Sequence, residues 1–457
     1  MVNTSNPNAQ TADTAEPATR RQLRTVVFAA SFGNLVEWFD FTSYGLLAAT
    51  LAMHFFTATG EGGGTQALLL AFATFGAGFV ARPVGGILLG IFADRRGRKP
   101  ALLLSIGLMG AATAVVAVLP DQKSIGIIAP ILLLLARLLQ GAAADGEWGG
   151  AASFLVEWAP KTRRGVFGSF HTATIFVGTL TGSLVIAGLT GALGADAMAD
   201  WGWRIPFAIG GLLALIAIPI RLRAEETPIF RAEIESKSVP SGAKSTPDAV
   251  IDGEMGRGAL VRRLAYIFCL VGMQSAAVYT FTSYYPSFVT QFTTDGSQPV
   301  GSGAALFSNA LASVVVIVVV ISSGFVSDRI GRKPAMMLSC FLVLVLPYPL
   351  LSLVIAAHSF AVTVLVQCIL AASVALFLGC LPVVLVESIP ARVRVAGLST
   401  SYNVASAVFG GFAPLIAGAL VAVTGAPPTA ALWTVFAAAI STVAVFFFKE
   451  SRGNPLS

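Results

Sequence analysis

Apolar stretches of helix length alternate with short polar segments along most of the chain. Twelve of these stretches are near or above the roughly 20 residues that an α-helix needs to cross a bilayer. They cover residues 25–55, 66–92, 100–119, 124–157, 165–194, 204–222, 262–291, 303–326, 335–356, 359–387, 397–423 and 430–448. The pattern therefore predicts an all-α membrane protein with twelve transmembrane helices.

The longest polar segment, residues 224–260, separates the first six stretches from the last six. We expect a disordered cytoplasmic tail (1–22), a first six-helix bundle (23–223), a cytoplasmic linker (224–260), a second six-helix bundle (261–449) and a C-terminal cytoplasmic tail (450–457). No cleavable signal peptide is predicted, because Glu37 and Asp40 interrupt the first apolar run and no small-residue cleavage site follows a compact apolar core.

Lys and Arg residues indicate how the spans are oriented. With twelve spans, 25 of the 29 basic residues lie in the tails and loops of one side of the membrane. An odd number of spans would mix the two sides. The positive-inside rule therefore predicts that both termini are cytoplasmic.

The composition excludes a soluble protein. Of the 457 residues, 55% are hydrophobic and 11% are charged, whereas a soluble domain carries roughly 25% charged residues. The net charge of +6 does not indicate a nucleic-acid partner, because the basic residues occupy short loops between apolar runs. The four cysteines lack the spacing of a metal site or of a disulfide framework. The lipid bilayer is the partner that this composition predicts.

The two halves of the chain repeat each other. The loop GIFADRRGRKP at 90–100 returns as GFVSDRIGRKP at 324–334, which is 234 residues later. The pair Val156-Glu157 returns as Val386-Glu387, which is 230 residues later. Repeated halves around a central linker are typical of alternating-access carriers, whose substrate site lies between the halves near mid-membrane.

The repeated loops and the string RLLQG at 137–141 resemble the major facilitator superfamily. Four further strings resemble its metabolite:proton symporter family, the bacterial permeases for citrate, 2-oxoglutarate, shikimate and proline or betaine. They are GNLVEWFDF at 33–41, ARPVGG at 81–86, GEWGG at 146–150 and WGWRIPF at 201–207. The resemblance implies two six-helix bundles related by a pseudo-twofold axis, a bacterial inner-membrane location, a functional monomer, and a proton as coupling ion with no other cofactor.

Ionisable residues inside a span are costly, which makes them functional candidates. In the first span Gly33, Glu37, Asp40 and Tyr44 follow helical spacing and form one polar stripe. One carboxylate of this stripe carries the coupling proton, or both acids form permanent ion pairs with the second or fourth span. The spacing does not separate Glu37 from Asp40. Tyr44 is a candidate substrate contact.

In the second span Arg82 stands twelve residues before Asp94, so about 18 Å of helix separates it from the cytoplasmic end. A guanidinium presents a planar fork that fits a carboxylate. We therefore expect Arg82 to hold a substrate carboxylate near mid-membrane. The alternative is that it only balances the charge of Glu37 or Asp40.

The fourth span holds three further candidates for proton coupling, Arg137, Asp145 and Glu147. Arg137 is either a proton relay or a packing residue. Asp145 shares its helix face, and we favour it as the partner that neutralises Arg137 over an additional proton site. His171 in the fifth span is more typical of a packing or gate residue than of a pH switch.

The second half has neutral residues at the positions that match these charges. It is therefore expected to complete the substrate site with hydrogen-bonding groups. The candidates are Gln367, Tyr402 and Asn403.

The repeated loops are expected to form a cytoplasmic gate closed by ion pairs. The alternative is that their positive charge only sets the topology, but this would not require the Asp and Gly positions. The gate candidates are Gly90, Asp94, Arg95, Gly97, Arg98 and Glu157 in the first half and Asp328, Arg329, Gly331, Arg332 and Glu387 in the second.

We therefore predict a proton-coupled symporter that imports a small organic carboxylate by alternating access. One alternative is a proton-coupled carrier of a zwitterion such as betaine or proline, with an aromatic cage for the cation. Alternatives of another class are an uncoupled uniporter or channel and a membrane sensor. The sequence carries no nucleotide motif, metal cluster or nucleophile–base pair of the kind that an enzyme would need.

Overall fold

The computed structural model describes residues 20–56, 63–96, 98–144, 152, 155–156, 159–223, 257–293, 301–388 and 391–453. Within these ranges all regular structure is helical, as the sequence predicts.

Helices occupy the six ranges predicted in the first half. They are α1 (Arg20–Leu46) with α2 (Ala48–Phe55), α3 (Gly63–Arg96), α4 (Arg98–Val118), α5 (Gln122–Ile125) with α6 (Ile128–Ala143), α8 (Arg164–Leu193), and α9 (Ala195–Ala197) with the π-helix η3 (Met198–Gly202) and α10 (Arg204–Arg223).

Helices also occupy the six ranges predicted in the second half. They are α13 (Arg257–Tyr279) with the π-helix η4 (Thr280–Tyr284) and α14 (Tyr285–Phe292), α15 (Ser302–Ile330), α16 (Arg332–Val345) with α17 (Pro347–Ala357), α18 (Phe360–Ser388), α19 (Ala391–Ala405) with the π-helix η5 (Ser406–Gly411) and α20 (Ala413–Thr424), and the 3₁₀-helix η6 (Pro427–Ala431) with α21 (Leu432–Phe446).

Eight of the described helices are long and apolar enough to cross a membrane, and the number rises to ten if each bent pair counts as one span. The bent pairs are Ala195–Gly202 with Arg204–Ile220, at 56°, and Arg332–Val345 with Pro347–Ala357, at 47°. The helices α1 and α6 fill the two remaining predicted ranges. The count of twelve spans stays a prediction.

Several spans predicted as continuous helices are broken, and prolines account for three of the breaks. Pro286, Pro347 and Pro414 each stand in the first two positions of a new helix, α14, α17 and α20. Proline has no backbone N–H and its ring collides with the preceding turn, so the chain widens into a π-turn or bends before it.

The fourth span also differs from its predicted range of 124–157. Gly126 adopts a left-handed φ of +62° after α5, and the long helix α6 begins only at Ile128 and ends at Ala143. Residues 145–151 lie outside the described part of the chain.

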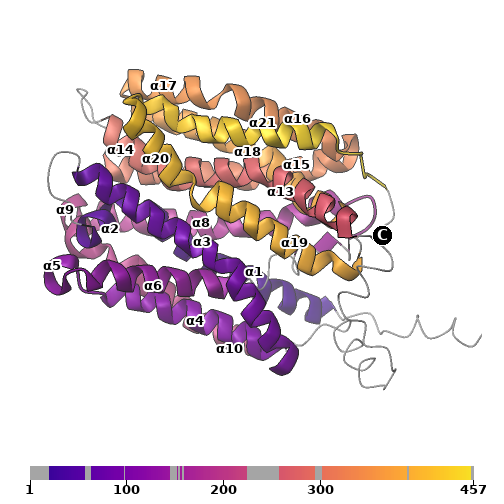
Figure 1. Ribbon diagram of the computed structural model, residues 1–457, viewed down its shortest axis with the longest axis horizontal. Helices are drawn as coiled ribbons and strands as arrows, with labels where there is room; N and C mark the ends of the chain where they lie inside the picture. Colours follow the sequence, from indigo (N-terminus) through magenta and orange to yellow (C-terminus); the bar gives the residue numbers. More distant parts are fainter. Residues whose placement is uncertain are drawn as a thin grey trace, which may run out of the picture.

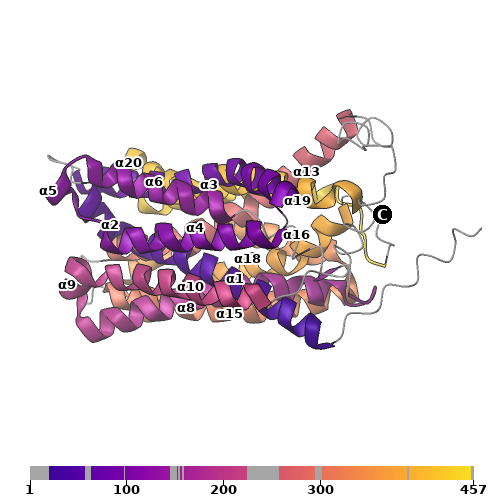
Figure 2. The ribbon, with the colours of Figure 1, turned by 90° about the horizontal axis from the view of Figure 1, so that it is seen from below.

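The two halves lie side by side with their helices roughly parallel to the long axis (Figure 1). Helix α8 of the first half runs along α15 of the second half, as Figure 2 shows. The contacts along this pair include Thr190 against Gly303, Ser183 against Asn309 and Ser169 against Gly324. The α8–α15 pair therefore joins the halves from one end to the other.

We refer to the end that carries the basic loops around Arg95, Lys161, Arg329 and Lys449 as the basic end, which lies on the right in Figure 1. The halves also meet at the opposite end. A Cβ at Gly45 of α1 would lie 2.8 Å from the Oγ of Ser283 in η4, and one at Gly418 of α20 would lie 3.1 Å from Leu69 of α3.

Candidate substrate and proton site

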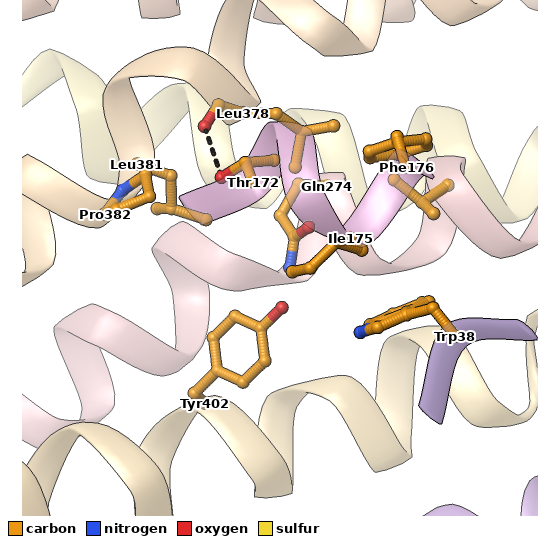
Figure 3. Close-up of a pocket in the computed structure, with 10 residues that line it drawn as sticks. Trp38, Thr172, Ile175, Phe176, Gln274, Leu378, Leu381, Pro382 and Tyr402 are labelled. Carbon is orange, nitrogen blue, oxygen red and sulfur yellow. Dashed lines mark hydrogen bonds between the residues drawn. The ribbon is translucent and has the colours of Figure 1, made fainter. Parts of the chain in front are cut away.

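A small cavity lies between the two halves (Figure 3). The first half contributes Trp38 from α1 and Thr172, Ile175 and Phe176 from α8. The second half contributes Gln274 and Val278 from α13, Leu378, Leu381 and Pro382 from α18, and Tyr402 from α19. The Tyr402 hydroxyl points toward the Gln274 amide across this space (Figure 3). A molecule in the cavity would contact both halves at once.

Beside the cavity, Glu37 and Arg82 form an ion pair between α1 and α3. An Nη atom of Arg82 donates a hydrogen bond to Glu37 Oε1 at 3.2 Å. The side chain of Arg82 is 5% exposed and that of Glu37 is 15% exposed. The pair is therefore buried on the arginine side and partly open on the carboxylate side.

Aromatic rings connect this ion pair to the cavity wall. The Arg82 guanidinium lies 4.4 Å from the ring centre of Phe79 and 4.5 Å from that of Phe41. Phe79 meets Tyr279 edge to face at 4.9 Å, and Tyr279 stacks on Trp38 at 6.1 Å. Trp38 lines the cavity and follows Glu37 directly in the chain, so the rings of Phe79, Tyr279 and Trp38 connect Arg82 to the cavity wall.

A second ion pair, Asp40 with Arg137, is sealed inside the first half. An Nη atom of Arg137 lies 3.1 Å from Asp40 Oδ2, and the side chains are 0% and 1% exposed respectively. The hydroxyl of Thr113 and the amide of Gln140 each donate to Asp40 Oδ1 at 2.9 Å. The hydrogen-bond donors to this carboxylate therefore come from α4 and α6.

Glycines bring Arg137 to this position. A Cβ on Gly141 would lie 1.8 Å from the carbonyl oxygen of Gly78, and one on Gly85 would lie 1.9 Å from that of Ala142. Helices α3 and α6 therefore touch backbone to backbone. This close approach places the Arg137 guanidinium over the ring of Tyr44 at 4.4 Å and opposite α1.

The structure pairs Arg137 with Asp40 of α1, whereas the sequence favoured Asp145 as its partner. Asp40 faces Arg137 directly across the α1–α6 contact. Asp145 and Glu147 themselves lie outside the described residues, so their proposed part in coupling stays a prediction.

The other predicted substrate contacts are distributed unevenly. Tyr402 lines the cavity, and Asn403 is buried next to it on α19. The hydroxyl of Tyr44 donates to the carbonyl oxygen of Ala71 at 3.2 Å, and its side chain is 0% exposed. Tyr44 therefore packs against Arg137 and α3, away from the cavity-lining residues.

Gln367 belongs to a buried polar cluster of the second half. Its amide nitrogen donates to Phe281 O at 3.0 Å and to Asn309 Oδ1 at 2.8 Å, while its amide oxygen accepts from Ser308. Asn309 in turn donates to Ser183 of α8 at 2.9 Å. All hydrogen-bonding groups of the Gln367 side chain are used within the protein, so a substrate would have to displace one of them.

At the basic end, Asp328 of α15 caps the first turn of α8. Its two carboxylate oxygens accept from the backbone N–H groups of Gly165 and Val166 at 2.8 and 2.9 Å. A carboxylate at a helix N-terminus satisfies free N–H groups and opposes the positive end of the helix dipole. The contact joins the two halves by helix capping, whereas the sequence predicted ion pairs alone.

Ion pairs surround this cap. Arg332 is 1% exposed and lies 3.5 Å from Asp328 and 3.3 Å from Glu387. Glu387 also lies 3.9 Å from Arg164 of the first half and accepts a hydrogen bond from Ser451 in the C-terminal segment.

Glu450 holds the C-terminal segment on α16. Its carboxylate accepts from the backbone N–H groups of Arg332 and Lys333 at 3.1 and 3.0 Å. Burial alone would raise the pKa of Glu450, but these donors and the N–H of Arg452 outweigh it and lower that pKa below its usual range. Gly331 must be glycine here, because its φ is +104° and a Cβ would lie 2.6 Å from Glu450.

Of the remaining gate candidates, only Gly90, Arg95 and Arg329 have described surroundings, and they do not join this cluster. Arg95 and Arg329 are exposed, and a Cβ on Gly90 would meet nothing within 4 Å. Asp94 and Arg98 lie at helix ends, but their side chains are outside the described set. Gly97 and Glu157 lie outside the described residues. Their gate role stays a prediction.

Comparison with known families identifies the fold. The model of the Major Facilitator Superfamily matches residues 31–411. The chain belongs to the Major Facilitator Superfamily. Its relatives place it among the metabolite:proton symporters. It is a multi-pass transporter of the bacterial inner membrane and not an enzyme.

Curated relatives of this superfamily member cover nearly its full length. The chain is 32% identical to the citrate-proton symporter of Klebsiella pneumoniae, over 93% of the chain and 92% of the relative. It is 35% identical to the alpha-ketoglutarate permease of Escherichia coli, over 96% of each. It is 29% identical to the proline/betaine transporter of Escherichia coli, over 95% of the chain and 85% of the relative.

A solved crystal structure of a D-xylose-proton symporter has the same fold, with a TM-score of 0.74 over 95% of this chain and all of that one. The sequence identity is 18%, so this likeness concerns the fold alone.

Residues of this superfamily member that the sequence analysis missed are mostly neutral. Thr113 gave no signal because threonine is common in apolar helices. Gln140 stands one helical turn after Arg137 within the RLLQG string, and that spacing is the signal that could have found it. Glu450 and Ser451 lie in a short tail where capping depends on the folded arrangement.

Proposed function

We propose that this transporter is a proton-coupled symporter that imports a small organic carboxylate by alternating access. The observation that carries the proposal is the Glu37–Arg82 ion pair, which is partly open beside a cavity lined by both halves. The citrate-proton symporter and alpha-ketoglutarate permease among the relatives support both the carboxylate and the proton.

The proposed membrane topology rests on the position of the basic loops. Twelve spans form two six-helix bundles, and the basic end faces the cytoplasm. The Asp328 cap on α8 and the Arg332–Glu387 cluster then close the cytoplasmic side, and both must separate when the substrate leaves.

Coupling would begin at Arg82. A substrate carboxylate that reaches the guanidinium competes with Glu37 for the same fork of N–H donors. A displaced Glu37 carboxylate would be left partly buried without its cation, which favours taking up a proton. Substrate binding and protonation would therefore depend on each other, as symport requires.

The Asp40–Arg137 pair would act as a structural support for this site. Its carboxylate accepts hydrogen bonds from Arg137, Thr113 and Gln140 within α4 and α6, and both charged side chains are buried. We expect it to keep α1 in the orientation that presents Glu37 to α3.

A carrier of zwitterions is the second candidate. The proline/betaine transporter among the relatives favours it, and the same ion pair offers one charge of each sign. A zwitterion could place its carboxylate on Arg82 and its cation near Glu37.

Uptake into proteoliposomes tests the proposal. The purified full chain should accumulate a labelled acid such as 2-oxoglutarate, citrate or shikimate against its gradient when an inward proton gradient is imposed, and only equilibrate it without one. Accumulation of glycine betaine in place of every acid would favour the second candidate. Equilibration that no gradient changes would overturn proton coupling.

A further inference from the structure

The number of cations available to a substrate is small. Away from their first and last two turns, the described helices contain two arginines, Arg82 and Arg137, no lysine, and one histidine, His171. The amide nitrogen of Asn34 lies 3.5 Å from Nδ1 of His171 and can only donate to it, which is the contact of a neutral imidazole. Arg137 is 0% exposed and bound to Asp40. Arg82 is therefore the remaining guanidinium in this region of the described helices, and its ion-pair partner Glu37, which already balances its charge, directly precedes the cavity-lining Trp38.

The cavity lining adds no charge. Its polar members are Thr172, Gln274, Tyr402 and the indole of Trp38, which are all neutral (Figure 3). The Thr172 hydroxyl also donates to the carbonyl oxygen of Leu378, at 3.4 Å. The remaining lining side chains are apolar. These groups can bind hydroxyl or carbonyl groups and cover an apolar body, but they cannot balance a second carboxylate.

Charge balance then limits what the site can carry. Charge without a partner inside the membrane is strongly disfavoured. Before binding, Arg82 and Glu37 cancel. When one carboxylate takes the place of Glu37 on Arg82 and Glu37 takes up one proton, the charges cancel again. A second or third carboxylate would enter without a further cation from the interior of the described helices to compensate it.

We propose that the substrate of this transporter carries a single carboxylate on an uncharged body, and that it crosses with one proton as an electroneutral pair. The proposal rests on the proposed symport at Glu37 and Arg82 and specifies its substrate class and stoichiometry. It sets this chain apart from relatives whose names refer to citrate and alpha-ketoglutarate, which carry three and two carboxylates.

Charge balance also favours an uncharged body over a zwitterion. A zwitterion brings its own cation, which would balance Glu37 in place of a proton. The aromatic lining residues are Trp38, Phe176 and Tyr402, and Tyr279 stacks on one face of Trp38. Several ring faces can bind a quaternary ammonium, so betaine is the zwitterion that the experiment must include.

The experiment uses the full chain in proteoliposomes with an inward proton gradient. Labelled shikimate and lactate represent single-carboxylate acids of two sizes, 2-oxoglutarate and citrate represent multiple carboxylates, and glycine betaine represents zwitterions. Potassium and valinomycin set the membrane potential at zero or about 100 mV, negative inside. A cycle that moved one net charge would change the accumulation ratio by up to about 50-fold at this potential.

The proposal predicts that a single-carboxylate acid accumulates. 2-Oxoglutarate and citrate should inhibit its uptake at least about tenfold more weakly than other single-carboxylate acids do. The membrane potential should change the accumulation ratio less than about twofold. Accumulation of 2-oxoglutarate or citrate in preference would overturn the single-carboxylate inference and leave proton symport standing. Accumulation that follows the potential would overturn electroneutrality. Uptake of betaine alone would overturn the uncharged body, and no gradient-driven uptake of any compound would overturn the proposed function itself.

A charge added to the cavity gives a second test. Gln274→Lys should shift competition toward 2-oxoglutarate by about tenfold or more relative to a single-carboxylate acid, because the second carboxylate then has a cation. Gln274→Met, which has similar length and no charge, should not. Equal selectivity in both variants, with both proteins retaining the melting temperature of the parent, would contradict the charge-balance argument.

Discussion

Asp328 in the second half accepts the backbone N–H of Gly165 in the first half at 2.8 Å, across the α8–α15 contact that joins the halves. The same carboxylate also caps Val166, so one side chain links the two halves at the basic end by holding the start of a helix. In the proposed gate, the basic end would open when this carboxylate leaves the helix end, which requires no change in covalent structure.

Asp328→Ala should therefore loosen the basic end. Hydrogen bonds to a charged acceptor contribute about 1.5–3 kcal/mol, so amide exchange at Gly165 and Val166 should quicken at least about tenfold. Hydrogen–deuterium exchange of the protein in detergent or nanodiscs would measure it. Arg329→Gln is the matched control, because Arg329 is the exposed neighbour of Asp328 and should leave this exchange unchanged. Equal protection in both variants would show that the cap does not hold the end closed.

Gly141→Ala should destabilise the first half. Its Cβ would lie 1.8 Å from Gly78 O, so α3 and α6 would have to separate and Arg137 would move away from Asp40. Overpacking of this kind costs about 1–3 kcal/mol, and more when it disrupts a buried ion pair. A fall of several degrees in the melting temperature is expected. Gly107→Ala in α4 has open space beside it and should not lower the melting temperature. A wild-type melting temperature for Gly141→Ala would refute the close helix contact.

Glu450→Gln tests the attachment of the C-terminal segment to α16. The pKa of Glu450 is lowered in the folded protein, so its stabilising contribution is present above the ordinary pKa of a glutamate and is lost as the pH falls through the lower, folded value. The variant should therefore be less stable than the parent at pH 7, by about 0.5–1 kcal/mol, and this difference should shrink as the pH falls below the ordinary pKa of a glutamate. Melting temperatures across this pH range would measure the difference. A difference that stayed constant with pH would exclude the charge as its cause.

The fold could be predicted from the sequence further than the site could. Apolar runs indicated where helices lie, because lipid requires the same apolar surface of every span. The break at Leu47 and the left-handed Gly126 did not follow from those runs, since both depend on how neighbouring helices end. Pro286 and Pro414 were visible in the sequence, but the π-helices before them depend on packing in the second half.

The site illustrates a similar limit. Glu37 and Asp40 are visible as charges in a span, yet their pairing was not predictable. Three residues along a helix rotate a side chain by about 60° from its starting direction, so the two acids face different neighbours. Glu37 meets α3 and Asp40 meets α4 and α6, and the glycine contact between α3 and α6 determines which arginine each one reaches.

Arg82→Ala tests the binding of the substrate carboxylate. The change is made in a Glu37→Gln background so that no uncompensated carboxylate remains. Loss of a bidentate ion pair should weaken inhibition of uptake by a carboxylic acid at least about tenfold relative to Glu37→Gln alone. Competition binding with the labelled substrate would measure it. Affinity within about twofold of the Glu37→Gln protein would place the carboxylate elsewhere.

The central claim is that Glu37 carries the coupling proton, and comparison of Glu37→Gln with Asp40→Asn tests it most directly. Both proteins are reconstituted, and gradient-driven accumulation is compared with substrate exchange at equal pH on both sides. The Glu37→Gln protein should lose accumulation and keep exchange. The Asp40→Asn protein should have a lower melting temperature, and the fraction that remains folded should keep accumulation. Accumulation by Glu37→Gln together with its loss in a folded Asp40→Asn protein would contradict this assignment and make the sealed Asp40–Arg137 pair the site of coupling.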